Sequence, residues 1–228
     1  MEKLGTVYGG WVLPTNSILD ENSIVYSIGV GEDMSFDLLL QSKYNSNIYL
    51  IDPTERAFTH FDELKRYYNT HIWNFSGDIQ KDYKKHIEYL NPNFSKFTYL
   101  NIGAWNSTTQ LKFYKQHNTQ YVSQSVIQNM FGDDYDTINV TTIKNIMEEN
   151  NHTKIDLVKM DIEGAEVAVL NNMLDDNILP RYLCIEFDLY LKNKDYTNET
   201  QKILNRLLEK YTILANDDMN MTLQLIDT

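Results

Sequence analysis

The sequence contains one cysteine, Cys184, and only four prolines among 228 residues. A single cysteine excludes an intramolecular disulfide, and its position in the apolar run Tyr182–Phe187 predicts a buried, unreactive thiol. The chain also lacks any run of about 18 apolar residues, the length that a membrane-spanning helix requires. It does not begin with a basic segment followed by an apolar one, as a secretory signal does. We therefore expect a cytoplasmic protein with no membrane partner.

Positive charge is scarce as well, since 20 Lys and Arg face 32 Asp and Glu, for a net charge of −12. A protein that follows the phosphates of nucleic acid needs a basic surface, so we expect no nucleic-acid partner. The length suits one α/β domain with a single core. We predict a domain over residues 23–228, preceded by an irregular lead-in over residues 1–22 that either carries a short helix or folds over the site.

The stretch Lys159–Glu166, called here the hub turn, gathers three acids around one glycine. The apolar run Ile155–Met160 leads into it and predicts a strand buried on both faces, while the apolar spacing that follows predicts a helix. Ligands of open α/β sheets bind outside the carboxyl ends of the strands. Asp161 and Glu163 would therefore hold a cation, a sugar hydroxyl or a proton. The alternative is a solvated turn whose acids only favour the start of the helix.

A second strand-to-helix turn, the glycine turn, occupies residues 29–33 with the sequence Gly-Val-Gly-Glu-Asp. It follows the β-branched run Ser23–Ile28 and precedes apolar residues at helical spacing. The next predicted strand, Asn47–Ile51, ends in Asp52. Glycines that admit a nucleotide to the backbone, followed by an acid that binds ribose hydroxyls, have this arrangement. An ordinary tight turn is the alternative.

The acids of the glycine turn indicate which nucleotide it binds. A dinucleotide fingerprint needs a third glycine, but Met34 stands there. Glu32 and Asp33 would repel a pyrophosphate at the start of the helix. S-adenosylmethionine has no phosphate, carries a sulfonium and an ammonium, and offers ribose hydroxyls to Asp52. We therefore predict that the turn binds S-adenosylmethionine.

The rest of the chain continues the α/β pattern. Further strands are predicted at Lys96–Asn101, Ile138–Ile143 and Tyr182–Asp188, with a strand off the main sheet at Gln110–Tyr114, a helix at Glu199–Tyr211 and a terminal hairpin of Tyr211–Ala215 with Met221–Ile226. The small-residue turn Ile102–Trp105 is a candidate to bracket an adenine. Residues 121–126 offer hydroxyls and amides to a polar acceptor.

Together, these segments resemble the FkbM family of S-adenosylmethionine-dependent methyltransferases over nearly the whole chain. The matching segments are Gly9–Trp11, Val25–Asp33, Ser35–Asp37, Ile51–Thr54, Val122–Ser125, Lys159–Glu166 and Ile185–Phe187. The resemblance implies a Rossmann-like α/β fold of the class I methyltransferase type, with a seven-stranded, mostly parallel sheet and a terminal antiparallel hairpin. It also implies O-methylation, with a sugar hydroxyl of a glycan as the acceptor.

The resemblance and the patterns assign a role to each candidate residue. The predicted cofactor-binding residues are Gly29, Gly31, Glu32, Asp52, Pro53, Thr54, Asn101, Gly103 and Ala104. The predicted acceptor-binding residues are Ser123, Gln124 and Ser125. The predicted catalytic residues are Asp161, Glu163, Glu186 and Asp188. In one alternative, these carboxylates take the proton of the acceptor hydroxyl. In the other, Asp161, Glu186 and Asp188 bind Mg²⁺ or Mn²⁺, which lowers the pKa of the acceptor hydroxyl.

One departure from the family and two other functions bear on this assignment. Many relatives have Glu-Phe-His where this chain has Glu186-Phe187-Asp188, which removes that histidine as a proton acceptor. A nucleotide-sugar oxidoreductase or epimerase would use Tyr190 and Lys194 as a Tyr-x-x-x-Lys pair, although the acidic glycine turn argues against it. The third alternative is a non-catalytic module that keeps the nucleotide pocket and binds a partner.

Overall fold

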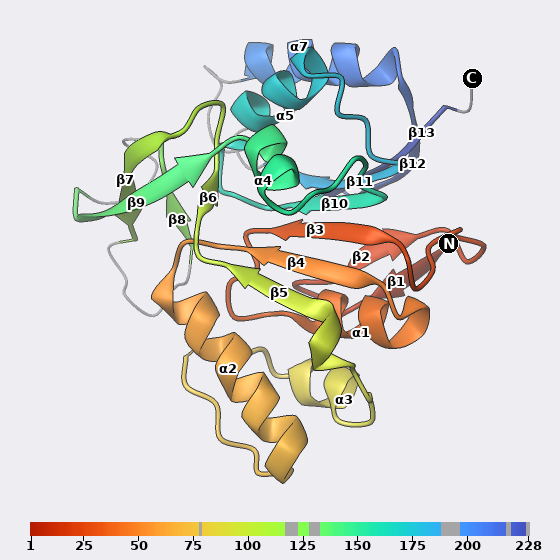
Figure 1. Cartoon of the computed structure of the whole chain (residues 1–228), viewed down its shortest axis with the longest axis vertical. Helices are drawn as coiled ribbons and strands as arrows, with labels where there is room; N and C mark the ends of the chain where they lie inside the picture. The colour runs from red at the N-terminus through yellow and green to blue at the C-terminus, as the bar shows by residue number, and fades with distance from the viewer. Residues whose placement is uncertain (78, 117–122, 128–132, 188–196, 218–219, 227–228) are drawn as a thin grey trace.

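Figure 1 shows the computed structural model of the chain, in which a central sheet lies between two groups of helices. The structure describes residues 1–77, 79–116, 123–127, 133–187, 197–217 and 220–226. The predicted site residue Asp188 and the Tyr190 and Lys194 pair lie outside these ranges. Their predicted roles therefore stay predictions.

The main sheet has seven strands in the order β12-β13-β11-β10-β3-β4-β5. Their bounds are β3 (Ile24–Ile28), β4 (Asn47–Ile51), β5 (Phe97–Leu100), β10 (Leu157–Met160), β11 (Tyr182–Glu186), β12 (Tyr211–Asp217) and β13 (Asn220–Leu225). The five strands from β11 to β5 pair in parallel, while β13 runs antiparallel to both of its neighbours. The sheet is therefore mixed. Its antiparallel pairings are those of β13, which forms with β12 the terminal antiparallel hairpin that the sequence predicts. The short β12–β13 connection forces this reversal, because parallel neighbours need a long crossover.

Two apolar clusters hold the helices against the sheet. The helices are α1 (Ser35–Tyr44), α2 (Glu55–Thr70), α3 (Tyr83–Ile87), α4 (Ile143–Glu149), α5 (Glu166–Asp175) and α7 (Thr197–Leu208), with a 3₁₀ turn η1 (Phe94–Lys96). One cluster joins α1, α2 and α3 to the sheet, and the other joins α4, α5 and α7 to it. Neighbouring residues of β3 divide between them, Val25 in the first and Tyr26 in the second. Because side chains alternate along a strand, the clusters lie on opposite faces, as Figure 1 shows.

The first residues of the chain form a hairpin of β1 (Glu2–Leu4) and β2 (Trp11–Leu13) rather than the irregular or helical lead-in that the sequence predicts. Leu4, Trp11 and Leu13 are buried in the first apolar cluster. The hairpin also meets the main sheet, since the Thr222 hydroxyl donates to the Val12 carbonyl over 2.9 Å. The residues between the two strands, Gly5–Gly10, are called the N-terminal turn below.

A second sheet has four strands in the order β6-β9-β7-β8. Its members are β6 (Gly103–Ala104), β7 (Thr109–Lys115), β8 (Gln124–Ser125) and β9 (Tyr135–Thr141). The predicted strand off the main sheet, Gln110–Tyr114, is confirmed by β7. The strand predicted to reach Ile143 ends at Thr141 instead, because Thr142 caps α4 by accepting the Asn145 N–H.

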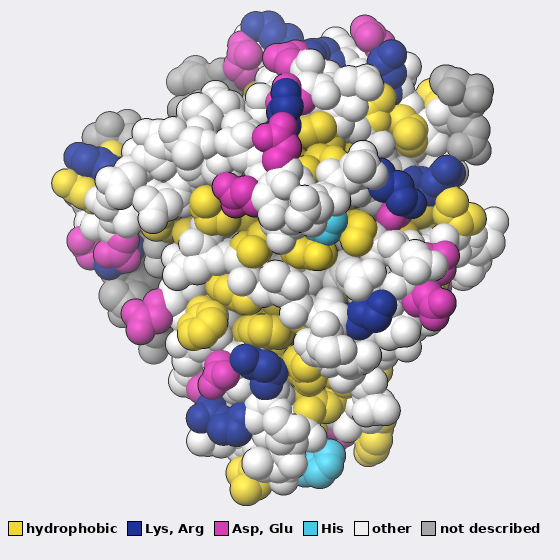
Figure 2. Space-filling model, viewed as in Figure 1, with side chains coloured by type: hydrophobic (Ala, Val, Ile, Leu, Met, Phe, Trp, Pro, Cys, Tyr) yellow, Lys and Arg dark blue, Asp and Glu magenta, His cyan; other side chains and the backbone are white. Residues whose placement is uncertain are grey.

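The face in Figure 2 carries Lys and Arg side chains beside Asp and Glu side chains at both ends of the molecule. None of the helices in the described ranges combines the length and the apolar character that crossing a membrane requires.

Candidate active site

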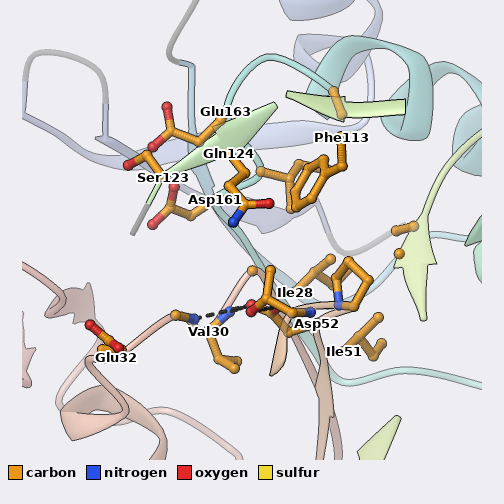
Figure 3. A pocket seen from close by; sticks show the side chains of 18 of the residues that line it. Ile28, Val30, Glu32, Ile51, Asp52, Phe113, Ser123, Gln124, Asp161 and Glu163 are labelled. Atoms are coloured by element: carbon orange, nitrogen blue, oxygen red, sulfur yellow. Dashed lines mark hydrogen bonds between the residues drawn. The ribbon is translucent and has the colours of Figure 1, made fainter. Parts of the chain in front are cut away.

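A cavity of about 250 Å³ lies at the carboxyl ends of β3, β4 and β10. In Figure 3, Val30 and Asp52 lie on one side of it, while Gln124, Asp161 and Glu163 lie on the other. The glycine turn, the residues after β4 and the hub turn thus face one space. This is the place where open α/β sheets bind ligands.

The glycine turn and the hub turn touch each other, because β3 and β10 are neighbours in the sheet. Gly29 has φ +71°, and a Cβ atom at this position would lie 1.8 Å from the Asp161 carbonyl oxygen. Gly31 also has a positive φ, +52°. Only glycine adopts such angles without steric cost, and at residue 29 only glycine leaves room for the hub backbone.

The Asp52 carboxylate braces the glycine turn. Its Oδ2 accepts the N–H groups of Val30 and Gly31 at 3.0 and 3.1 Å. Its Oδ1 accepts the N–H and hydroxyl of Thr54 at 2.9 and 2.6 Å. A carboxylate offers about four acceptor positions, and the protein itself fills them here. Asp52 therefore determines the shape of this wall, while its predicted contact with a ribose stays a prediction.

The two acids of the glycine turn itself, Glu32 and Asp33, also have protein partners. Glu32 is buried and pairs with Arg56, whose Nε and Nη2 donate to the two carboxylate oxygens over 2.9 and 2.7 Å. Asp33 accepts the N–H and hydroxyl of Ser35 over 3.0 and 2.6 Å, and the Thr6 hydroxyl over 2.5 Å. The glycine turn is thus a rigid element whose acids are held by charge and hydrogen bonds.

Lys159, in the hub turn, connects the two turns. Its side chain is buried, and its Nζ donates to the Gly29 carbonyl and, over 3.4 Å, to the Ile28 carbonyl. The same Nζ lies 3.7 Å from Asp161 Oδ2. The sequence analysis did not assign Lys159 a role, although a lysine inside a fully buried strand signals a partnered charge.

Two side chains hold the hub turn in shape. Glu166 Oε1 accepts the N–H groups of Ile162 and Gly164 at 3.0 and 3.1 Å, as acids at a helix start commonly do. The Ser125 hydroxyl donates to the Glu163 carbonyl over 2.6 Å. Glu163 itself has φ +52°, a left-handed conformation that few non-glycine residues adopt. These bonds stabilise a turn that directs Glu163 to the cavity.

Most of the predicted site residues line the cavity, and three of the described ones do not. Those in the lining are Gly29, Gly31, Glu32, Asp52, Pro53, Thr54, Gly103, Ala104, Ser123, Gln124, Asp161 and Glu163. Asn101 is exposed outside it, Ser125 is fully buried behind Glu163, and Glu186 ends the neighbouring strand β11.

The cavity also has walls from residues that the sequence analysis did not name as site residues, although one of its alternatives was a lead-in that folds over the site. Phe113, Ile138 and Val140 form an apolar wall from the second sheet, and Phe113 is visible in Figure 3. Tyr8 and Gly9 form another wall from the N-terminal turn. The alternation in β7 and β9 predicts strands, but no local pattern shows which space they face.

A comparison with known families identifies the family of this chain. The family model for the Methyltransferase FkbM domain matches residues 13–212, most of the chain. The chain belongs to the FkbM methyltransferase family. The family resemblance predicted from the sequence is thereby confirmed, and the family implies S-adenosylmethionine as the methyl donor.

Other comparisons with this FkbM methyltransferase add little. A chain in a crystal structure of a fibrillarin/Nop5p complex is 11% identical, with a TM-score of 0.47, and the match covers 92% of this chain and 75% of that one. A likeness at this level supports no argument about function. No curated protein matches the sequence.

The cavity of this FkbM methyltransferase suits a positively charged ligand. Its described lining residues include five carboxylates and one ammonium, that of Lys159. The five carboxylates are those of Glu32, Asp33, Asp52, Asp161 and Glu163. Apolar side chains such as Ile51 and Val140 complete the walls. A ligand that joins a cationic end to a flat nucleoside fits both features.

The predicted divalent cation finds no support. Within the described ranges, no three His, Cys, Asp or Glu side chains are grouped so that they could hold a metal ion. Of the predicted ligands, Asp161 faces the Lys159 ammonium instead, and Asp188 lies outside the described residues.

Proposed function

We propose that this FkbM methyltransferase methylates a hydroxyl oxygen of a sugar in a glycan. The observation that carries the proposal is one cavity in which the Asp161 carboxylate and the glycine turn face the same space. The hydroxyl and amide of Ser123 and Gln124 line this space and suit a polar acceptor. The sugar class of the acceptor rests on likeness to the family.

The glycine turn and its neighbours would hold the cofactor. In this assignment, Gly29, Gly31 and Glu32 hold its amino-acid end, and the residues after β4 hold its ribose. When bound, S-adenosylmethionine supplies a methyl group on a positively charged sulfur. The protein must then orient the acceptor oxygen in line with that group and take up the acceptor's proton.

We assign the proton to Asp161. Its side chain is 32% exposed beside the cavity, and Lys159 holds it in place from 3.7 Å. As the new C–O bond forms and the S–C bond breaks, the hydroxyl proton passes to the Asp161 carboxylate. In this assignment, Glu163, which also lines the cavity, accepts other hydroxyls of the same sugar.

The test is mass spectrometry of a glycan mixture incubated with isotope-labelled S-adenosylmethionine. The wild-type protein should add labelled methyl groups to sugar hydroxyls. Asp161→Asn should lower the rate by about 10²- to 10⁴-fold, since an amide cannot accept the proton. Its affinity for S-adenosylhomocysteine, measured by calorimetry, should change much less. The exposed Asp62 supplies the control, because Asp62→Asn removes a charge far from the cavity.

A chelator provides a second arm of the same experiment. Activity should survive EDTA, because the Lys159 ammonium already supplies the positive charge beside Asp161. Full activity of Asp161→Asn would disprove the base assignment. Binding of NAD without binding of S-adenosylhomocysteine would instead favour the oxidoreductase alternative.

A further inference from the structure

Tyr8 combines two properties that seldom occur together. It belongs to the cavity lining, yet 68% of its surface is exposed, so its ring borders the cavity mouth instead of filling the interior. Val7, beside it, is 78% exposed but does not line the cavity. A large ring held at the edge of a binding cavity offers an apolar surface to whatever enters.

The backbone that carries Tyr8 is fixed to the glycine turn. The Thr6 N–H donates to the Ser35 hydroxyl over 2.9 Å, and the Thr6 hydroxyl donates to Asp33. The Gly9 N–H donates back to the Thr6 hydroxyl over 2.8 Å. A Cβ atom at Gly9 would lie 2.6 Å from the Asp33 carboxyl carbon, so this residue packs directly on that acid. The ring is exposed, but its attachment point is held in place.

The charges of carboxylates on three elements act on the Tyr8 hydroxyl. Desolvation by nearby protein atoms raises the pKa of Tyr8, and so do the charges of Asp161, Glu163, Glu186 and Asp33. The sign follows because both low polarity and negative charge disfavour a phenolate. The hydroxyl is therefore protonated at neutral pH and can donate a hydrogen bond to a ligand.

These observations describe a surface with an apolar ring on one side and acids on the other. A sugar ring is complementary to it: its C–H face packs on an aromatic ring, and its hydroxyls donate to carboxylates. An anionic acceptor would be repelled by the same acids. A cationic amine would also bind to acids beside an aromatic ring, so an amine ligand is included in the test below.

We propose that Tyr8, with Glu163, forms the acceptor subsite and binds a neutral sugar ring at the mouth of the cavity. The inference rests on the proposed function, because it names the acceptor of the same site. It assigns the N-terminal turn a role in acceptor recognition and none in the transfer step.

Binding can be tested separately from transfer. Saturation-transfer NMR of the glycan mixture with protein saturated by S-adenosylhomocysteine should detect sugar protons in contact with the wild type. Tyr8→Ala should weaken this binding about tenfold, because it removes the ring. Tyr8→Phe keeps the ring and should lose only about two- to threefold. Val7→Ala, the matched exposed neighbour, should bind like the wild type.

Three outcomes would overturn the inference. The first is unchanged sugar binding by Tyr8→Ala. The second is an equal loss of S-adenosylhomocysteine affinity in Tyr8→Ala, which would make Tyr8 part of the cofactor wall. The third is that a lysine-rich peptide, offered in parallel, binds in place of the sugars. Methyl transfer to the glycans by the wild type decides the proposed function independently of these results.

Discussion

The glycine turn and the hub turn have the same local plan and different roles. Each follows a buried parallel strand, contains glycine with positive φ, and opens a helix. In the glycine turn, Glu32 is paired with Arg56, and Asp33 accepts hydrogen bonds from Thr6 and Ser35. In the hub turn, Asp161 faces the cavity and meets Lys159 at 3.7 Å, beyond hydrogen-bond length.

The difference shows how the same kind of strand-to-helix turn can either form a rigid wall of the site or present a reactive carboxylate. Acids bound by protein donors stabilise a shape, as those of the glycine turn do. An acid held only by a nearby charge keeps acceptor positions for a substrate, as Asp161 does. Lys159 connects the two, because one ammonium touches both the Gly29 carbonyl and Asp161.

The largest expected effect on stability comes from a substitution that creates a steric clash between the two turns. Gly29→Ala would place a Cβ atom 1.8 Å from the Asp161 carbonyl, so the turns must separate. The free energy of unfolding should fall by more than about 5 kcal/mol, or the chain should fail to fold. Gly31→Ala is the matched control, since it shares the positive φ and should cost about 1 kcal/mol. Similar losses for both, in urea unfolding, would contradict the contact.

The next effect comes from removing the connecting charge. Lys159→Met keeps most of the side-chain volume but leaves Asp161 and the buried Asp37 without the ammonium. Stability should fall by about 1 to 3 kcal/mol, because the Gly29 carbonyl loses its charged donor. Lys65→Met, at a partly exposed helix position, should change it by less than about 0.5 kcal/mol. A loss below about 1 kcal/mol at residue 159 would mean that the two turns are held by backbone packing alone.

Asp37, on α1 just behind the glycine turn, provides a pH-dependent test. Burial raises the pKa of this carboxyl from 3.8 to about 6, partly opposed by Lys159. Between about pH 4 and pH 6 the folded state keeps the proton while the unfolded state has lost it, so this contribution to stability is lost as pH rises. Asp37→Asn removes this dependence of stability on pH. Its free energy of unfolding, relative to that of the wild type, should therefore rise by up to about 3 kcal/mol between pH 4 and pH 7.

Urea unfolding at the two pH values measures this difference. Asp62→Asn, an exposed substitution, should show almost no pH-dependent gain. A constant difference between Asp37→Asn and the wild type across this range would show that Asp37 is ionised throughout.

The smallest expected effect is at Cys184, which pairs in register with Lys159 beneath the hub turn. Burial raises the pKa of its thiol to about 12, opposed by the hydrogen bond between the thiol and Thr222 and by the charge of Lys159. The folded protein should therefore show no reaction with a thiol reagent at pH 8, and the thiol should react only on unfolding. Rapid labelling of the folded protein would mean that the sheet under the two turns opens locally.

Much of the scaffold was predictable from local patterns. The strand predicted at Asn47–Ile51 has those bounds in β4, and the glycine turn and hub turn both lie at carboxyl ends of strands, as expected. The spacing of apolar residues and the positions of glycines are local properties of the sequence. They therefore predict strands, helices and turns without reference to the residues that pack against them. The terminal hairpin of β12 and β13 was predicted as well, but the position of β13 between β11 and β12 was not, because it depends on pairing with both strands.

The candidate site was predictable in part. The carboxylates of the hub turn and the glycines line one cavity, but Asn101 and Ser125 do not, although they lie next to residues that do. For Ser125 the reason is its position on β8, where alternation turns its side chain away from the cavity that Gln124 lines. A one-residue shift in a strand reverses the face, and the loop pattern of residues 121–126 did not reveal that strand.

By itself, the sequence determined the order of strands and helices, the two glycine-containing turns, the acidic character of the site and the family. Only the tertiary structure decided that Lys159 connects the turns, that the second sheet forms an apolar wall, and that Tyr8 stands at the mouth. The physical reason is that side-chain period depends on the local backbone, whereas these neighbours are brought together by sheet order and core packing over more than a hundred residues.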